Sequence, residues 1–91
     1  MSCSLKYSER AKSDLAFLKR NDPNSFKKAV KLLDEIMDHP KTGTGKVENL
    51  KGANGEYWSR RINQKDRLIY TIYEMVVEVH IVSARGHYSD K

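Results

Sequence analysis

The stretch that decides the fold of this chain runs from residue 57 to residue 84 and reads YWSRRINQKDRLIYTIYEMVVEVHIVSA. It holds three runs rich in β-branched and aromatic residues, YWSRRI (57–62), RLIYTIY (67–73) and VVEVHIVSA (76–84). The turn-like NQKD and the short EM separate these runs, a pattern typical of strands joined in sequence. The stretch therefore predicts three neighbouring strands in an antiparallel meander.

Apolar and polar side chains alternate along the last of these runs. Val77, Val79 and Ile81 fall on one side of the strand, and Glu78 and His80 fall on the other. Such alternation is expected when one face of an antiparallel sheet packs on a core and the other meets solvent. We therefore expect helices to cover the face that carries the valines.

Two amphipathic helices precede the sheet. The first is expected to begin after Ser8, a good N-cap, and the second after Asp22, with Pro23 in its first turn and Pro40 at its end. Their apolar stripes are Ala11, Leu15 and Leu18 in the first helix, and Phe26, Ala29, Val30, Leu33, Ile36 and Met37 in the second. A short edge strand around residues 5–7 completes the order β-α-α-β-β-β, an α+β fold with two helices on a small antiparallel sheet.

A loop of unusual composition joins the second helix to the strands. Residues 40–55, PKTGTGKVENLKGANG, contain four glycines and three lysines and show no apolar period. Loops of this length are uncommon in small domains unless they have a function. We therefore expect functional residues in this segment.

Composition limits the classes of protein to consider. The 91 residues, 38% of them hydrophobic, suffice for a single domain over residues 1–91 with one core. No apolar run is long enough to span a membrane, so we expect a cytoplasmic protein with no membrane partner. The lone Cys3 excludes an internal disulfide, and no residue spacing indicates a metal site or a cofactor. The net charge of +5, with basic residues concentrated between 41 and 67, favours a polyanionic partner.

Four residues near the predicted sheet form a set with chemical meaning. Glu48 lies in the glycine-lysine loop, Arg67 begins the middle strand, and His87 and Tyr88 follow the last strand. Singly, each is commonly a solvent-exposed or structural residue. Together they supply a base, a cation, an acid and an aromatic surface, which suffice for metal-free RNA cleavage because RNA carries its own 2′-hydroxyl nucleophile.

Three blocks resemble one known family. GTGKVENLKG (43–52), YWSRRINQKDRLIY (57–70) and the HY pair at 87–88 are similar to the YoeB (Txe) toxins of the RelE superfamily of ribosome-dependent mRNA interferases. The resemblance implies a RelE-like fold, with Glu48 as general base, Arg67 as phosphate stabiliser, His87 as general acid and Tyr88 as the aromatic neighbour of the substrate. It further implies RNA backbone contacts from basic residues of the loop and the first strand of the meander, namely Lys46, Lys51, Arg60 and Arg61.

The same resemblance implies partners. They are mRNA in the A site of the ribosome and a YefM-type antitoxin with an acidic segment, and a homodimer is left open. Two alternatives stay open from the residues: a gyrase-directed toxin of the ParE branch, which generally lacks the loop glutamate and the terminal His-Tyr, and a non-catalytic module that binds RNA or protein. Because only the RNA-cleaving enzyme would leave a 2′,3′-cyclic phosphate and a 5′-hydroxyl, the RNA ends discriminate among the three.

Overall fold

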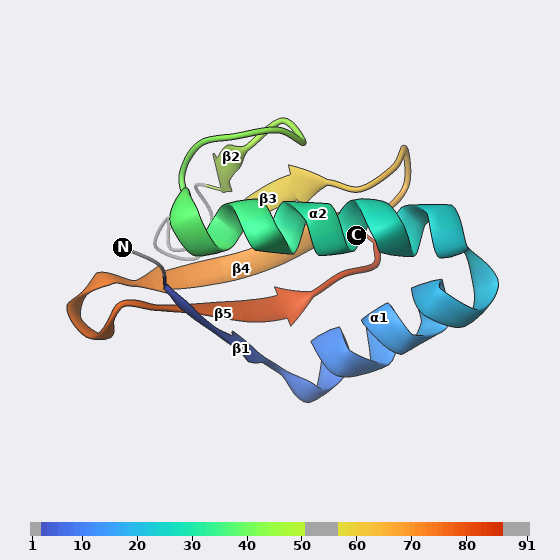
Figure 1. The fold of residues 1–91 in the computed structure, drawn as a ribbon, viewed down its shortest axis with the longest axis horizontal. Helices are drawn as coiled ribbons and strands as arrows, with labels where there is room; N and C mark the ends of the chain where they lie inside the picture. The colour runs from blue at the N-terminus through green and yellow to red at the C-terminus, as the bar shows by residue number, and fades with distance from the viewer. Residues whose placement is uncertain (1–2, 51–56, 87–91) are drawn as a thin grey trace.

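The computed structural model describes residues 3–50 and 57–86, which form one mixed sheet and two helices. In chain order the elements are β1 (Ser4–Tyr7), α1 (Glu9–Asn21), α2 (Pro23–Asp38), β2 (Glu48–Leu50), β3 (Tyr57–Arg61), β4 (Arg67–Tyr73), the 3₁₀ turn η2 (Glu74–Val76) and β5 (Glu78–Ser83). The strands lie in the order β1-β5-β4-β3-β2, and α2 runs across one face of the sheet (Figure 1). The expected α+β architecture is therefore confirmed.

The helices begin where the sequence indicates. The Ser8 hydroxyl accepts a hydrogen bond from the Ala11 backbone N–H at 2.9 Å and donates one to the Val82 carbonyl, so it caps α1 and ties it to β5. Asp22 caps α2 by accepting from the Ser25 N–H, and Pro23 occupies the first turn. Neither helix in the described ranges is long and apolar enough to cross a bilayer.

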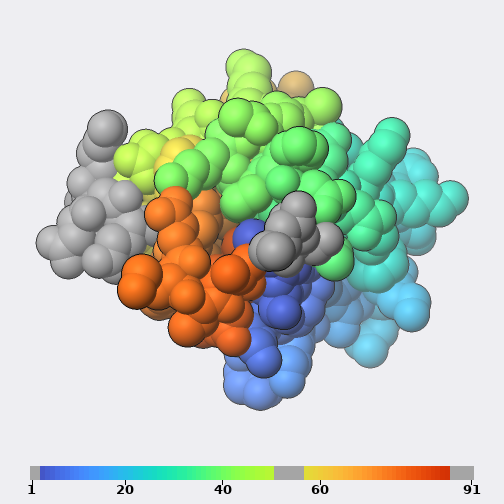
Figure 2. Space-filling model, turned by 60° about the vertical axis from the view of Figure 1, so that its left-hand side comes forward, coloured from blue at the N-terminus to red at the C-terminus, as the bar shows by residue number. Residues whose placement is uncertain are grey.

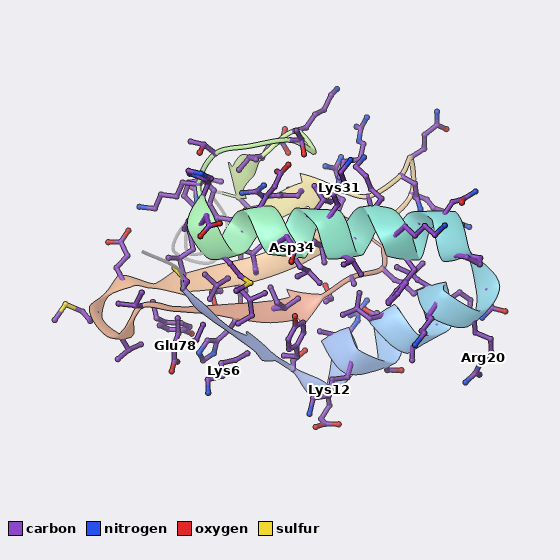
Figure 3. All side chains as sticks on the ribbon, viewed as in Figure 1. Lys6, Lys12, Arg20, Lys31, Asp34 and Glu78 are labelled. Carbon is purple, nitrogen blue, oxygen red and sulfur yellow. The ribbon has the colours of Figure 1, made fainter. Side chains whose placement is uncertain are left out.

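The core lies between α2, α1 and the covered face of the sheet. It is built from fully or almost fully buried apolar side chains, which include Ala11, Leu18, Ala29, Leu32, Ile36, Leu68, Tyr70, Val79 and Ile81. Polar residues such as Lys12 of α1 and Lys31 of α2, both labelled in Figure 3, are exposed to solvent. Most residues of the predicted stripes are therefore buried or half-buried, as amphipathic helices on a sheet require. The prediction was wrong for Val30, which is 40% exposed, and it left out Leu32, which is fully buried.

Two strands differ from the expectation. β1 pairs with β5 in parallel, with Leu5 opposite Val79, so the sheet is mixed and not purely antiparallel. A parallel pair needs a long connection, and here almost the whole domain lies between the two strands. The second difference is β2, a strand of three residues within the predicted loop. It pairs with β3, and Glu48 lies opposite Ser59.

Val77 is the third difference. It was expected on the inner face of the last strand, but it lies outside β5, is 40% exposed and has a left-handed backbone with φ 56°. The reason is the tight reversal through η2, which requires a residue with positive φ immediately before Glu78. Val79 and Ile81 are fully buried as predicted.

Candidate active site

Glu48 and Arg67 meet on the face of the sheet turned away from α2, which we call the open face. Glu48 on β2 is paired with Ser59 on β3, and Arg67 on β4 is paired with Arg61 on β3. Their side chains approach across β3, with Glu48 Oε1 3.9 Å from Arg67 Nη1. The glutamate side chain is 60% exposed and the arginine side chain 18% exposed, so a carboxylate accessible to solvent lies beside a cation fixed by its surroundings.

The segment before His87 lies next to Arg67. The Arg67 backbone N–H donates to the Gly86 carbonyl at 3.2 Å, and Gly86 has a positive φ of 76°, which favours glycine. The structure therefore brings the last residue before the His-Tyr pair to the start of β4. His87 and Tyr88 themselves lie outside the described residues.

Two buried carboxylates fasten this segment. Asp14 of α1 accepts from the Ala84 N–H at 3.0 Å, and Asp66 of the β3–β4 turn accepts from the Gly86 N–H at 3.0 Å. Both side chains belong to residues that are less than a tenth exposed. The Arg85 guanidinium between these two anchor points lies 3.6 Å from the centre of the Phe17 ring.

Neither aspartate is among the predicted site residues, although the sequence carries a signal for Asp14. Asp14 lies three residues after Ala11 and four before Leu18, inside the apolar stripe of α1. A carboxylate at such a position is buried and needs donors. Asp66 had only the weaker signal of an acidic residue ending a turn.

Two polar atoms beside the ion pair have no protein partner. Among residues 3–50 and 57–86, the buried side-chain atoms without a hydrogen bond are Ser59 Oγ and Arg61 Nε, both on the open face of β3. Buried polar atoms are nearly always paired in folded proteins, so these two are exceptions. Because both atoms are buried, a ligand would reach neither without a shift of the neighbouring side chains. Lys46 is exposed, has φ 51° and lies two residues before β2 in the sequence. Lys51 lies outside the described residues.

Arg60 has a different place from the one expected. It points to the opposite side of β3, its side chain is fully buried, and its guanidinium bonds to Glu35, to Tyr70 and to two backbone carbonyls. A guanidinium enclosed in this way offers no donor to a phosphate, so the structure replaces the expected RNA contact of Arg60 with a structural role. Successive residues of a strand face opposite sides, and only one arginine of the pair can face the open side.

Charge and burial act on the partners of Arg60. Hydrogen bonds from the Thr44 backbone and hydroxyl, together with the Arg60 charge, lower the pKa of Glu35 below its ordinary value. Burial raises the pKa of the Tyr70 hydroxyl, although its bond to Arg60 acts in the other direction. Glu35 is therefore held as an anion and Tyr70 as a neutral donor at neutral pH.

Comparisons with known proteins show the family of this chain. Residues 7–88 match the model of the YoeB-like toxins of bacterial type II toxin-antitoxin systems. The toxin YoeB of Synechocystis sp. is 37% identical over 84 residues, which cover 92% of this chain and 95% of the relative.

Two solved structures from Staphylococcus aureus have the same fold. A YoeB dimer superposes with a TM-score of 0.84 at 34% identity, covering 97% of this chain and 100% of that one. The toxin in a heterotetrameric YoeB–YefM toxin-antitoxin complex superposes with a TM-score of 0.81 at 34% identity and the same coverage. The chain therefore belongs to the family of YoeB-like toxins of bacterial type II toxin-antitoxin systems.

Proposed function

We propose that this toxin is a metal-independent endoribonuclease that cleaves mRNA in the A site of the ribosome and thereby inhibits translation. The observation that carries the proposal is the Glu48–Arg67 pair on the open face, beside the backbone of Gly86. Family membership supports it, since the RelE superfamily that the sequence resembles consists of mRNA interferases. Such an enzyme acts where ribosomes are, in the cytoplasm.

In the proposed reaction the 2′-oxygen of one nucleotide bonds to the adjacent phosphorus while the bond from phosphorus to the 5′-oxygen breaks. Glu48 accepts the proton of the 2′-hydroxyl, and His87 gives a proton to the departing 5′-oxygen. Arg67 stabilises the additional negative charge on the phosphorane. The products are a 2′,3′-cyclic phosphate and a 5′-hydroxyl, and no metal or cofactor takes part.

Other residues would hold the RNA. We assign Tyr88 to orient or stack on the substrate, and Lys46, Lys51 and Arg61 to its phosphate backbone. Arg61 is paired with Arg67 across β3 and β4, so the two cations share the open face, which supports this assignment.

We also propose a protein partner. YefM accompanies the similar YoeB from Staphylococcus aureus, and a YoeB dimer is known from the same organism. By analogy this chain pairs with a YefM-type antitoxin and forms a homodimer. Its net charge of +5 suits an acidic antitoxin segment.

The test uses ribosomes programmed with an mRNA and a second mRNA carrying a 2′-deoxynucleotide at the cleaved position. We expect cleavage of the first, with a 5′-hydroxyl and a cyclic phosphate at the new ends, and no cleavage of the second. Short RNA fragments bearing 5′-phosphates, or equal cleavage of the deoxy substrate, would contradict the mechanism. This comparison avoids chelators, which would damage the ribosome itself.

Arg67→Ala tests the assignment of the cation. It should lower the single-turnover rate at saturating ribosomes by about 100-fold or more, because the lost charge acts on the transition state. Lys65→Ala is the matched control, since Lys65 is an exposed cation two residues away. Equal losses in the two variants would argue against a role for Arg67 in the chemical step.

A further inference from the structure

Arg60 connects β3 to the segment that follows α2. Its Nε donates to the Tyr70 hydroxyl at 3.0 Å, and its Nη1 donates to Glu35 Oε1 at 2.9 Å. Its Nη2 donates to the carbonyls of His39, the C-cap of α2, and of Thr42, the latter at 2.7 Å. One buried side chain thus holds the end of a helix and the loop beyond it.

The partners of Arg60 extend its reach along the loop. The Tyr70 hydroxyl donates to the Pro40 carbonyl at 2.9 Å. Glu35 accepts from the Thr44 backbone N–H at 2.9 Å and from the Thr44 hydroxyl. Backbone groups at residues 39, 40, 42 and 44 are therefore fixed directly by Arg60 or through one relay.

The loop backbone passes so close to Arg60 that a side chain at position 43 would force Arg60 or Glu35 to shift. A Cβ atom placed on Gly43, which has φ +130°, would lie 2.7 Å from Arg60 Nη1 and 2.7 Å from Glu35 Oε1. The next glycine is also held, because the Arg61 N–H donates to the Gly45 carbonyl. The loop is therefore packed around the guanidinium, although Figure 2 shows the segment after α2, in green, on the outside of the molecule beside the β4–β5 turn, in orange.

Glu48 begins β2 three residues after Gly45. β2 has only three residues and lies at the edge of the sheet, so its pairing with β3 gives it little independent stability. The position of the Glu48 carboxylate beside Arg67 then depends on the loop that leads into β2. That loop is held by Arg60.

We propose that Arg60 is a positioning residue, which fixes residues 39–44 through its guanidinium and thereby keeps Glu48 in place beside Arg67. The effect of Arg60 on cleavage rests on the proposed function. Its effect on the loop rests on the hydrogen bonds alone. Arg60 touches no substrate in this arrangement. It acts on the reaction only through the loop.

The principal test is Arg60→Lys, which keeps the positive charge but removes the planar fork that reaches several acceptors at once. Amide hydrogen exchange by NMR should show the Thr44 and Arg61 N–H groups exchanging at least about tenfold faster relative to the Val79 N–H in β5. Single-turnover cleavage of mRNA on programmed ribosomes should slow by about 10- to 100-fold, because small displacements of a catalytic group have effects of that size. The ribosome concentration for half-saturation should stay within about threefold.

Gly43→Ala disturbs the same contact from the loop, because its Cβ would lie 2.7 Å from Arg60 Nη1. It should reproduce the faster exchange at Thr44 and the slower cleavage. Leu18→Ala is the matched control, because it removes a fully buried side chain of α1 that makes no part of the Arg60 network. It should lower the melting temperature without a selective change at Thr44 or Arg61.

The proposal is overturned if Arg60→Lys and Gly43→Ala change loop exchange and cleavage no more than Leu18→Ala does. It is also overturned if the loop amides exchange faster while the cleavage rate stays at the wild-type value. If the wild-type toxin cleaves no RNA, the proposed function fails, and the exchange data still decide whether Arg60 fixes the loop.

Discussion

Removing the Asp66 carboxylate should destabilise the whole domain, because it fastens the end of β5 to the β3–β4 turn. Asp66 Oδ1 accepts from the Gly86 N–H and Oδ2 from the Asn63 side-chain amide, each at 3.0 Å. The residue is 5% exposed, so water replaces these bonds poorly in Asp66→Ala. Hydrogen bonds to a charged acceptor contribute about 1.5–3 kcal/mol each.

The expected loss in the free energy of unfolding is about 2–4 kcal/mol, less than the sum of the two bonds because the turn can admit some water once the carboxylate is gone. For a domain of this size the urea dependence is about 1–3 kcal/mol per molar, so the unfolding midpoint should fall by about 0.7–4 M. Urea titration followed by tryptophan fluorescence measures it, with Trp58 on β3 as the probe.

Two variants make the test specific. Asp66→Asn keeps one carbonyl oxygen for the Gly86 N–H but places an amide opposite that of Asn63, so about half the loss is expected. Gln64→Ala, an exposed position in the same turn, should change the midpoint by less than about 0.5 M, as exposed substitutions usually do. A midpoint for Asp66→Ala equal to that of Gln64→Ala would refute the reasoning, and so would equal losses in Asp66→Ala and Asp66→Asn.

Two further predictions concern other parts of the chain. The folded-state pKa of Glu35 lies below its ordinary value of 4.5, so the stability that this carboxylate contributes is present above pH 4.5 and is lost as the pH falls through the folded-state pKa. Glu35→Gln should therefore flatten the acidic part of the profile of stability against pH. Urea unfolding at a series of acidic pH values measures this profile. Deleting residues 89–91 should leave melting and mRNA cleavage intact, whereas deleting residues 87–91 should leave melting intact and abolish cleavage; a longer truncation that still cleaves mRNA would remove His87 from the mechanism.

Local signals predicted the parts of this fold that local interactions determine. Ser8 and Asp22 cap the helices, and Pro23 lies in the first turn of α2, because each acts on backbone groups within three or four residues. Val77 shows the limit of this reasoning. Its β-branched side chain favours a strand, but the geometry of the turn into β5 imposes a left-handed backbone that propensity does not express.

Contacts distant in sequence were not predicted. β1 pairs with β5, which lies some seventy residues later in the sequence. The sequence of β2 does not by itself indicate a strand, and β2 becomes one through its pairing with Trp58 and Ser59 of β3. The candidate site illustrates both cases. Glu48 and Arg67 were identified from their chemistry and expected placement, and they lie together. Arg60 and Arg61 were given the same role, although adjacent residues on a strand must face opposite sides.

The parallel pairing of β1 with β5 also determines when this protein can become native during its synthesis. β1 is synthesised first, but its partner β5 is the last strand in the described sequence. Ser4 therefore cannot pair with Glu78, and β1 cannot join the sheet, until β5 has been synthesised. Contacts of such large separation in sequence form late in folding. The anchoring of Ala84 and Gly86 to Asp14 and Asp66 comes later still, since it needs residues beyond β5. A nascent chain therefore carries the Glu48 and Arg67 side chains well before it has a complete five-stranded sheet, and it completes its fold only when residue 86 has left the ribosome that makes it.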